Sequence, residues 1–168
     1  ARHVESGRLR LVCGDLSALA NTPRPGEGFD LAILMFGVLG HIFSRALRQE
    51  TLATIRRLLR PGGRIIVTVP NAARRFLRRQ VMAQHLVREG QLEPGDIFYE
   101  RTADKVSVEM YYHLYTLEEF GRELEQQGFR LIQMRAESVL PESGVVKSVL
   151  LRWLDQLLVT IVPLRYAY

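Results

Sequence analysis

The hydrophobic pattern of the chain is clearest at residues 31–36, where six apolar residues follow one another before Gly37. Such a run predicts a strand that is covered on both faces of a parallel sheet and leaves the sheet through a small-residue loop. In doubly wound folds the ligand crevice lies at such strand exits. We therefore expect the chemistry of this protein near Gly37, Gly40 and His41.

The rest of the pattern predicts an α/β protein. Apolar residues at helical spacing predict helices at 45–60, 71–89 and 146–162, and a helix that begins at Thr116, with capping-box spacing to Glu119, and ends at Gly128. Strands are predicted at 9–13, 64–69 and 129–137, and a hairpin at 97–102 and 106–115. This order predicts a parallel sheet with right-handed crossovers.

The second arm of the predicted hairpin is rich in aromatic residues. Because side chains alternate along a strand, Tyr111, His113 and Tyr115 share one face and Tyr112 points to the other. These tyrosines either pack sideways on the body of the domain or form a hydrogen-bonding wall over a substrate pocket. In the second interpretation Tyr111 and Tyr112 bind substrate.

Composition limits the class of protein. The 168 residues are 47% hydrophobic and 24% charged, which is typical of one soluble globular domain. The net charge is +5, and nearly all of the positive charge is arginine. This excess admits a nucleic-acid partner, although arginine dominance also follows from coding bias alone. The single cysteine, Cys13, excludes an internal disulfide framework and fits a reducing compartment, so we expect a cytoplasmic protein without a membrane span.

A basic face is predicted on the helix at 71–89. At 100° per residue, Arg74, Arg75, Arg78 and Arg79 lie within an arc of about 140°. The arc is either a solvated surface or a face that contacts phosphates, in which case Arg78 and Arg79 bind the substrate.

Several kinds of site are missing from the sequence. The lone Cys13 and the scattered histidines lack the spacing of a zinc site, so no metal is expected. The sequence also lacks a nucleophile elbow, a phosphate-binding loop and a dinucleotide fingerprint. What remains is a crevice near Gly37 and Asp15, where Asp15 either presents a carboxylate or caps a short helical turn.

Three segments in a fixed order resemble one enzyme family. The sequences LRLVCGDL at 9–16, FDLAILMFGVLGHI at 29–42 and LLRPGGRIIVTV at 58–69 resemble the second half of class I S-adenosylmethionine-dependent methyltransferases. The resemblance implies a Rossmann-like sheet with helices on both faces, and places an inserted helix and hairpin, residues 71–115, on the substrate side. Residues 1–168 then form a single partial methyltransferase domain.

The resemblance also implies how S-adenosylmethionine is bound. The acidic turn contacts the adenine, and the exit of the following strand lines the methionine end and the acceptor. The cofactor-binding residues implied in this way are Gly14, Asp15, Leu16, Met35, Phe36, Gly37 and Val38.

The family pattern is incomplete in this chain. The first strand with its glycine-rich loop, and the acidic residue that binds the ribose, are expected upstream of Ala1. The last strand is expected to begin near Tyr166. We therefore expect an internal fragment that is truncated at both ends, binds the cofactor poorly on its own and does not readily fold alone.

The methyl acceptor is left open between a small molecule and tRNA. The segment 110–116, followed by Glu118 and Glu119, is similar to a tyrosine-tyrosine-histidine segment of methyltransferases that esterify carboxymethyl-uridine at the tRNA wobble position. An ionised carboxylate carries no proton to remove, so its methylation needs positioning more than a base. For an alcohol or amine acceptor, His41 is the first candidate base and His113 the second, unless His41 only packs or starts a helix.

Two other functions remain open. The chain is alternatively a methyltransferase-like binding module without catalysis, or an RNA-binding adaptor that works through its arginine face. The apolar helix at 145–163 is expected to cover its own domain, with a membrane interface or a protein partner as the alternatives.

Overall fold

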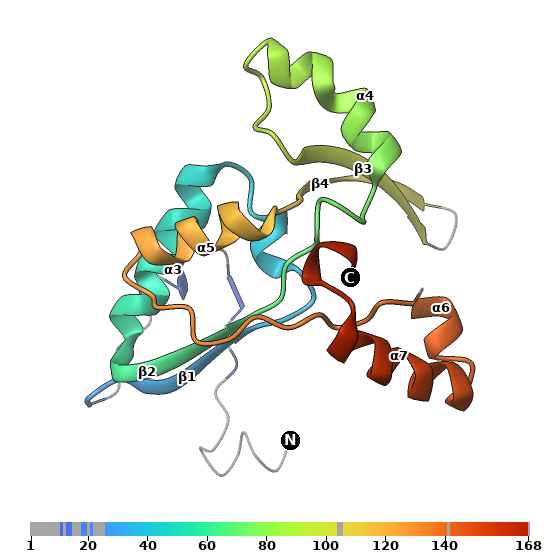
Figure 1. Ribbon diagram of the computed structural model, residues 1–168. Helices are drawn as coiled ribbons and strands as arrows, with labels where there is room; N and C mark the ends of the chain where they lie inside the picture. The colour runs from blue at the N-terminus through green and yellow to red at the C-terminus, as the bar shows by residue number, and fades with distance from the viewer. Residues whose placement is uncertain are drawn as a thin grey trace.

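The computed structural model describes residues 11, 13–14, 18–19, 21, 26–103, 106–140 and 142–167 (Figure 1). Its elements in order are β1 (Phe29–Leu34), η1 (Val38–His41), α3 (Arg45–Leu58), β2 (Leu59–Val67), α4 (Leu77–Arg88), β3 (Asp96–Ala103), β4 (Val106–His113), α5 (Leu117–Gln126), α6 (Glu142–Val145), α7 (Val149–Ile161) and η2 (Leu164–Tyr166). Within these residues β1 pairs with β2, and β3 pairs with β4. The predicted α/β class is confirmed.

The β1–β2 pair is parallel, as predicted, and α3 makes the connection between the two strands. The helix begins after Ser44, whose hydroxyl accepts a hydrogen bond from the backbone N–H of Leu47. The second strand begins at Leu59 rather than at residue 64, because Leu59 already pairs with Phe29. A register shift between Phe29 and Leu31 accommodates the turn-forming Pro-Gly-Gly segment within β2.

One face of this sheet carries the main core. Helices α3 and α5 lie together over that face (Figure 1). Leu52 of α3 and Phe120 and Leu124 of α5 are buried there, and Ile65 and Val67 of β2 pack against them. Burial of these apolar side chains is the main source of stability for this part of the chain.

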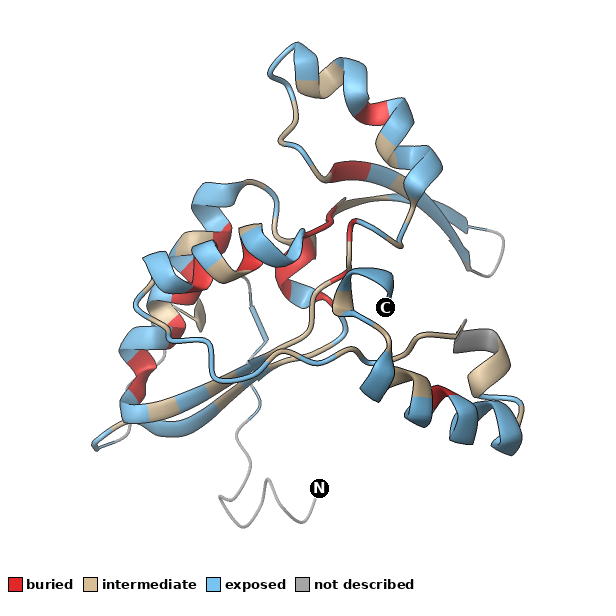
Figure 2. Cartoon of the chain, viewed as in Figure 1, coloured by how far each residue is buried: buried red, intermediate tan, exposed pale blue. Residues whose placement is uncertain are grey.

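The opposite face of the sheet is open, which corrects the prediction for residues 31–36. Leu31, Ile33 and Ile66 are 42%, 58% and 49% exposed, and no described helix packs against them. Figure 2 shows both strands largely in the colour of exposed residues. The apolar run therefore forms the predicted strand, but within the described residues helices cover only one face instead of two.

The predicted strand at 129–137 is absent from the structure. This segment makes no backbone ladder with any described strand. It lies across a groove of about 950 Å³ from β2, and the groove walls come from Gly62–Val69 and Gly128–Glu137. A strand needs a hydrogen-bonded neighbour, so the alternating pattern alone did not suffice here.

The predicted hairpin is confirmed as β3 and β4, but the helix predicted at 71–89 is shorter and begins at Leu77. Asn71 forms an isolated parallel bridge with Tyr115, and Phe76 has a left-handed φ of 54°. Residues 72–74 form a turn, and the left-handed geometry of Phe76 prevents that turn from continuing into α4. Arg74 and Arg75 therefore precede the helix, and the predicted four-arginine helical face is wrong.

The helix predicted at 146–162 is shorter in the structure, where α7 begins at Val149 after its cap Ser148 and ends at Ile161. The short helix α6, Glu142–Val145, precedes it. The expectation that the apolar helix covers its own domain is also wrong. Trp153, for example, is 65% exposed, and Leu150 is 78% exposed.

Two further predictions concern the strand at 9–13 and the absence of a membrane span. The strand predicted at 9–13 lies mainly outside the described residues, of which Leu11 and Cys13 belong to no strand. Among the described helices, none is long and apolar enough to cross a membrane.

The side chain of Asn71 fastens the carboxyl-terminal segment to the end of the sheet. Its Nδ2 donates hydrogen bonds to the carbonyl oxygens of Leu164, at 3.2 Å, and Ala167, at 2.7 Å. Its Oδ1 accepts one from the backbone N–H of Ala73 at 2.9 Å. One side chain thus connects residues 71–73 with residues 164–167.

We expect Asn71→Ala to lower the free energy of unfolding by about 1–3 kcal/mol, because the carbonyl oxygens of Leu164 and Ala167 lose the hydrogen bonds that Asn71 donates. Urea unfolding of the full-length protein measures this change. Gln84→Ala, at an exposed position on α4, is the control and should stay within about 0.5 kcal/mol of wild type. Equal stability of both variants would contradict the role of Asn71.

Candidate functional site

The exit of β1 is a sharp turn built from two residues with left-handed backbone geometry. Phe36 has φ 60° and Gly37 has φ 69°, and the 3-10 turn η1 follows directly. The N–H of Gly37 donates to Oγ1 of Thr68, just beyond β2, at 3.3 Å. The turn leaves Phe36 90% exposed and Val38 51% exposed, so apolar side chains point outward from the strand exit.

The β3–β4 hairpin closes over this turn through Tyr112. A Cβ atom added at Gly37 would overlap the Tyr112 hydroxyl, and one added at Gly40 would lie 2.7 Å from the His113 carbonyl oxygen. The rings of His41 and Tyr112 stack at 4.2 Å with an angle of 9° between their planes. Glycine is thus required at Gly37 and Gly40 because the hairpin backbone and Tyr112 come so close.

A larger aromatic cluster extends from this contact. Tyr112 also contacts the rings of Tyr99 and Phe76, at centroid distances of 5.9 and 6.3 Å. On the other face of β4, Tyr111 meets Phe43 at 4.8 Å and Phe98 at 5.9 Å. The two tyrosines therefore point to opposite faces of the hairpin, as strand alternation predicts.

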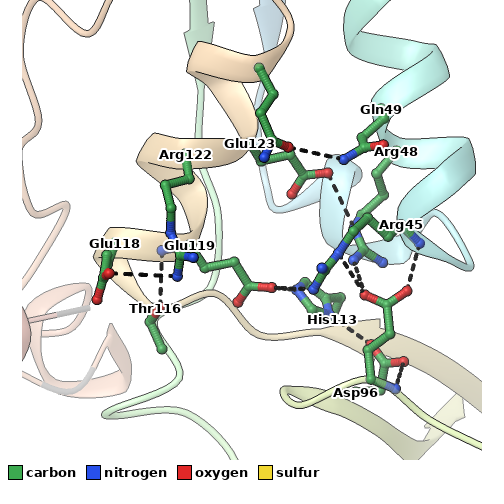
Figure 3. Close-up of polar contacts among 12 residues, drawn as sticks. Arg45, Arg48, Gln49, Asp96, His113, Thr116, Glu118, Glu119, Arg122 and Glu123 are labelled. Atoms are coloured by element: carbon green, nitrogen blue, oxygen red, sulfur yellow. Dashed lines mark hydrogen bonds and ion pairs between the residues drawn. The ribbon is translucent and has the colours of Figure 1, made fainter. Parts of the chain in front are cut away.

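A buried carboxylate holds the inner face of the hairpin (Figure 3). Oδ1 of Asp96 accepts hydrogen bonds from the Tyr111 hydroxyl and from Nδ1 of His113, each at 2.6 Å. Its Oδ2 accepts from the backbone N–H of Glu93 at 2.9 Å. Asp96 and His113 are 4% and 0% exposed. Because this cluster is shielded from water, its hydrogen bonds strongly restrict the two side chains.

Arg48 of α3 connects the hairpin to the body of the protein. Its guanidinium is fully buried and donates to Oε2 of Glu93 at 3.0 Å and to the Tyr111 hydroxyl at 3.1 Å. It also lies 3.7 Å from Oε1 of Glu123 and 5.7 Å from the centre of the Tyr115 ring. A buried cation must be paired, and here the partners come from α5, β4 and the loop before β3.

Arg45 and Glu119 complete the network around His113 (Figure 3). Arg45 Nη2 donates to Oε1 of Glu119 at 3.1 Å, and Arg45 Nε lies 3.1 Å from Oε2 of Glu93. The same Glu119 oxygen is 3.4 Å from Nε2 of His113. Thr116 caps α5 by accepting from the Glu119 N–H at 3.1 Å, as the capping-box spacing predicts.

The charges of this network support one another. Burial by itself would raise the pKa of Asp96, but the hydrogen bonds from His113 and Tyr111 outweigh it and hold that pKa below its usual value. Burial would lower the pKa of His113, but its contacts with Asp96 and Glu119 outweigh it and raise that pKa. The structure therefore favours an imidazolium between two carboxylates.

The structure brings together most of the residues that the sequence singled out. Met35, Phe36, Gly37, Val38 and His41 form the strand exit, and Tyr111, Tyr112 and His113 lie on the hairpin that covers it. Arg78 and Arg79 lie apart, exposed in the first turn of α4. Asp15 and Leu16 lie outside the described residues. Gly14 is described, and a Cβ atom added there would meet Ala18 rather than the strand exit.

Sequence reasoning missed Arg48, Glu93 and Asp96. Arg48 stands four and seven positions before Leu52 and Ile55, on the buried face of α3. An arginine in line with core positions is the signal that could have revealed it. Within the described residues, no group of His, Cys, Asp and Glu side chains is arranged to hold a metal ion.

The raised pKa of His113 gives a pH dependence of stability. The ion pairs of His113 stabilise the folded protein fully below about pH 6.5, the ordinary pKa of histidine. This stabilisation is lost as the pH rises through the raised pKa of His113. We expect the wild-type urea midpoint to fall over that alkaline range and the midpoint of His113→Gln to change less. His85→Gln, on exposed α4, should keep the wild-type dependence. Parallel curves for wild type and His113→Gln would exclude this assignment.

Comparisons with known proteins relate part of the chain to methyltransferases. Residues 1–67 match the family model described as a methyltransferase domain, a range that contains the strand exit and ends with β2. A search of curated protein sequences found no match.

Among 22 matching chains of solved structures is a S-adenosylmethionine-dependent methyltransferase from Clostridium acetobutylicum ATCC 824, with 13% sequence identity and a TM-score of 0.50. The match covers 80% of this chain and 59% of that one, so this chain spans less than two thirds of that protein. Residues 1–67 are therefore similar in sequence to a methyltransferase domain, and the fold of most of the chain is similar to that of a S-adenosylmethionine-dependent methyltransferase.

Proposed function

We propose that the full-length protein transfers a methyl group from S-adenosylmethionine to a small-molecule or tRNA acceptor in the cytoplasm. The observation that carries this proposal is the exit of β1, where a glycine turn lies beneath an aromatic hairpin. The methyltransferase-domain match to residues 1–67 supports it independently. The single cysteine supports the proposed compartment.

The strand exit fits the methionine end of this cofactor. Phe36 and Val38 present apolar side chains that are largely exposed, beside the half-buried Met35. Such side chains suit methylene and thioether groups, and the backbone at Gly37 offers little steric bulk. We assign Met35, Phe36, Gly37 and Val38 to that end, and Gly14, Asp15 and Leu16 to the adenine end. When bound, the cofactor supplies a methyl group on a positively charged sulfur.

His41 is placed to act as a general base for an acceptor that must lose a proton. Its Nδ1 lies 3.0 Å from the carbonyl oxygen of Tyr111. A carbonyl only accepts hydrogen bonds, so in the neutral imidazole the proton lies on Nδ1 and the lone pair on Nε2. The stacked ring of Tyr112 fixes the plane of the imidazole. Nε2 can therefore take a proton from an alcohol or amine, whereas an ionised carboxylate would need only positioning.

His113 is better suited to positioning than to proton transfer with the substrate. It is fully buried, and both ring nitrogens face carboxylates of Asp96 and Glu119. A base must come within hydrogen-bond reach of the acceptor. We therefore assign His113 to holding the hairpin over the strand exit.

An anionic acceptor such as tRNA is supported by the start of α4. Its first turn contains Arg78 and Arg79, has no acidic residue, and lacks a side-chain cap at Phe76. Cations at the positive end of a helix dipole are unfavourable for the helix itself. Their presence is explained if they face phosphates, and the same observation supports the alternative function of an RNA-binding adaptor without catalysis.

Titration of the full-length protein with S-adenosylmethionine in a calorimeter tests the proposal. Saturable binding is expected, followed by methylation of an acceptor. Binding without any methyl transfer would favour the non-catalytic binding module. Absence of binding, by calorimetry and by equilibrium dialysis, would exclude the enzyme.

For an alcohol or amine acceptor, we expect His41→Ala to lower kcat about 100-fold or more, since general-base catalysis contributes on this scale. The dissociation constant of S-adenosylmethionine should change far less. His85→Ala, an exposed histidine on α4, is the matched control. An unchanged kcat in His41→Ala would remove His41 from the mechanism.

If tRNA is the acceptor, Arg79→Ala should weaken its binding and reduce the slope of log affinity against log salt by about 1. Arg122→Ala, an exposed arginine on α5, is the control. Fluorescence anisotropy of labelled tRNA between low and high salt measures both slopes. Equal slopes for wild type and Arg79→Ala would exclude α4 from the tRNA contact.

A further inference from the structure

Helix α7 is anchored by one buried carboxylate. Asp155 is 4% exposed and accepts hydrogen bonds from the backbone N–H groups of Val139 and Leu140, each at 2.8 Å, and from the Ser138 hydroxyl at 2.9 Å. These bonds outweigh the effect of burial and lower the pKa of Asp155. The carboxylate therefore stays ionised and fixes the rotation of α7 about its axis.

The side of α7 opposite Asp155 is apolar and open to solvent. At 100° per residue its six apolar side chains lie within an arc of about 140°. They are between 45% and 78% exposed, and Figure 2 shows the helix mostly in the exposed colour. We call this set the α7 face: Val149, Leu150, Trp153, Leu154, Leu157 and Ile161.

Such a surface is unfavourable in an isolated protomer. A helix of 13 residues is marginal in water without a packing partner. At roughly 100 Å² for each exposed apolar side chain, the α7 face offers on the order of 600 Å². This approaches the about 800 Å² that each partner buries in a stable protein interface.

We propose that the α7 face pairs with the α7 face of a second copy of this chain, in antiparallel orientation. Leu150, Leu154, Leu157 and Ile161 follow one another at intervals of four, three and four residues, which is the spacing of a helix-packing seam. The order of these intervals is the same from either end of the helix. An antiparallel partner thus places Leu150 opposite Ile161 and Leu154 opposite Leu157, which satisfies the two-fold symmetry of a homodimer.

The charges around the helix agree with this pairing. The α7 face contains no charged residue, because Asp155 faces inward and Arg152 lies outside the apolar arc. No like charges are therefore brought together across the seam. A membrane-surface helix, in contrast, has a strongly charged polar face, whereas Arg152 is the only cation within α7.

Sedimentation of the full-length protein over a range of concentrations tests the pairing. Wild type is expected at twice the protomer mass, and the double variant L150E/L157E at the protomer mass, with the dissociation constant raised roughly 100-fold or more. The control is Val81→Glu, which places the same charge on an exposed apolar position of α4. Circular dichroism verifies that each variant is folded.

Cross-linking tests the orientation separately, and does not depend on a destabilising variant. In a protein with Cys13→Ser, L150C and I161C are prepared as single-cysteine proteins and treated with a short bis-maleimide. Antiparallel pairing gives cross-linked dimers mainly when the two proteins are mixed. Cross-linking of each protein with itself at equal yield would overturn the antiparallel arrangement.

Three results would overturn the proposal. These are a wild-type monomer at all concentrations, a dimer that survives L150E/L157E, and a monomer that binds phosphatidylserine vesicles through α7. None of these measurements depends on methyl transfer, so the dimer and the proposed function can fail separately.

Discussion

The buried guanidinium of Arg48 is the interaction on which the arrangement of the site depends. A fully desolvated cation is tolerated only when anions and hydrogen-bond acceptors surround it. Its partners Glu93, Tyr111 and Glu123 come from a loop, a strand and a helix that are far apart in sequence. Any movement of the hairpin away from α3 would separate this charge from Glu93 and Tyr111 and leave only Glu123 of α5 beside it, so the network strongly restricts the position of the hairpin.

That position determines the geometry at the exit of β1. Asp96 holds Tyr111 and His113 on one side of β4, and strand alternation then directs Tyr112 to the other side, against Gly37. The carbonyl of Tyr111 also selects the tautomer of His41. Electrostatic pairing on one face of the hairpin thus defines the orientation of the candidate base on the other face.

Local patterns predicted those elements whose partners are close in sequence. The cap at Thr116 and the β3–β4 hairpin formed where periodicity and turn residues placed them, and the helix predicted at 45–60 formed with an end two residues earlier, at Leu58. The segment 129–137 has a strand-like pattern, but a strand also needs a neighbour, which its own residues do not encode. Similarly, the run at 31–36 specified a strand without specifying how many of its faces are covered. Arg48 was missed because its partners are distant in sequence.

The site and the α7 face are each fixed by a buried acid, and the two anchors share no residue. Asp96 binds side chains of the hairpin, whereas Asp155 binds the backbone at residues 139 and 140. A buried carboxylate needs hydrogen-bond donors around it, so each acid holds the segment that carries it in one orientation. That orientation decides which side chains of the segment face outward. At the hairpin the outward residues surround the strand exit, and at α7 they form an apolar seam. The proposed acceptor recognition and the proposed self-association therefore depend on different anchors, and a substitution at one anchor leaves the other intact.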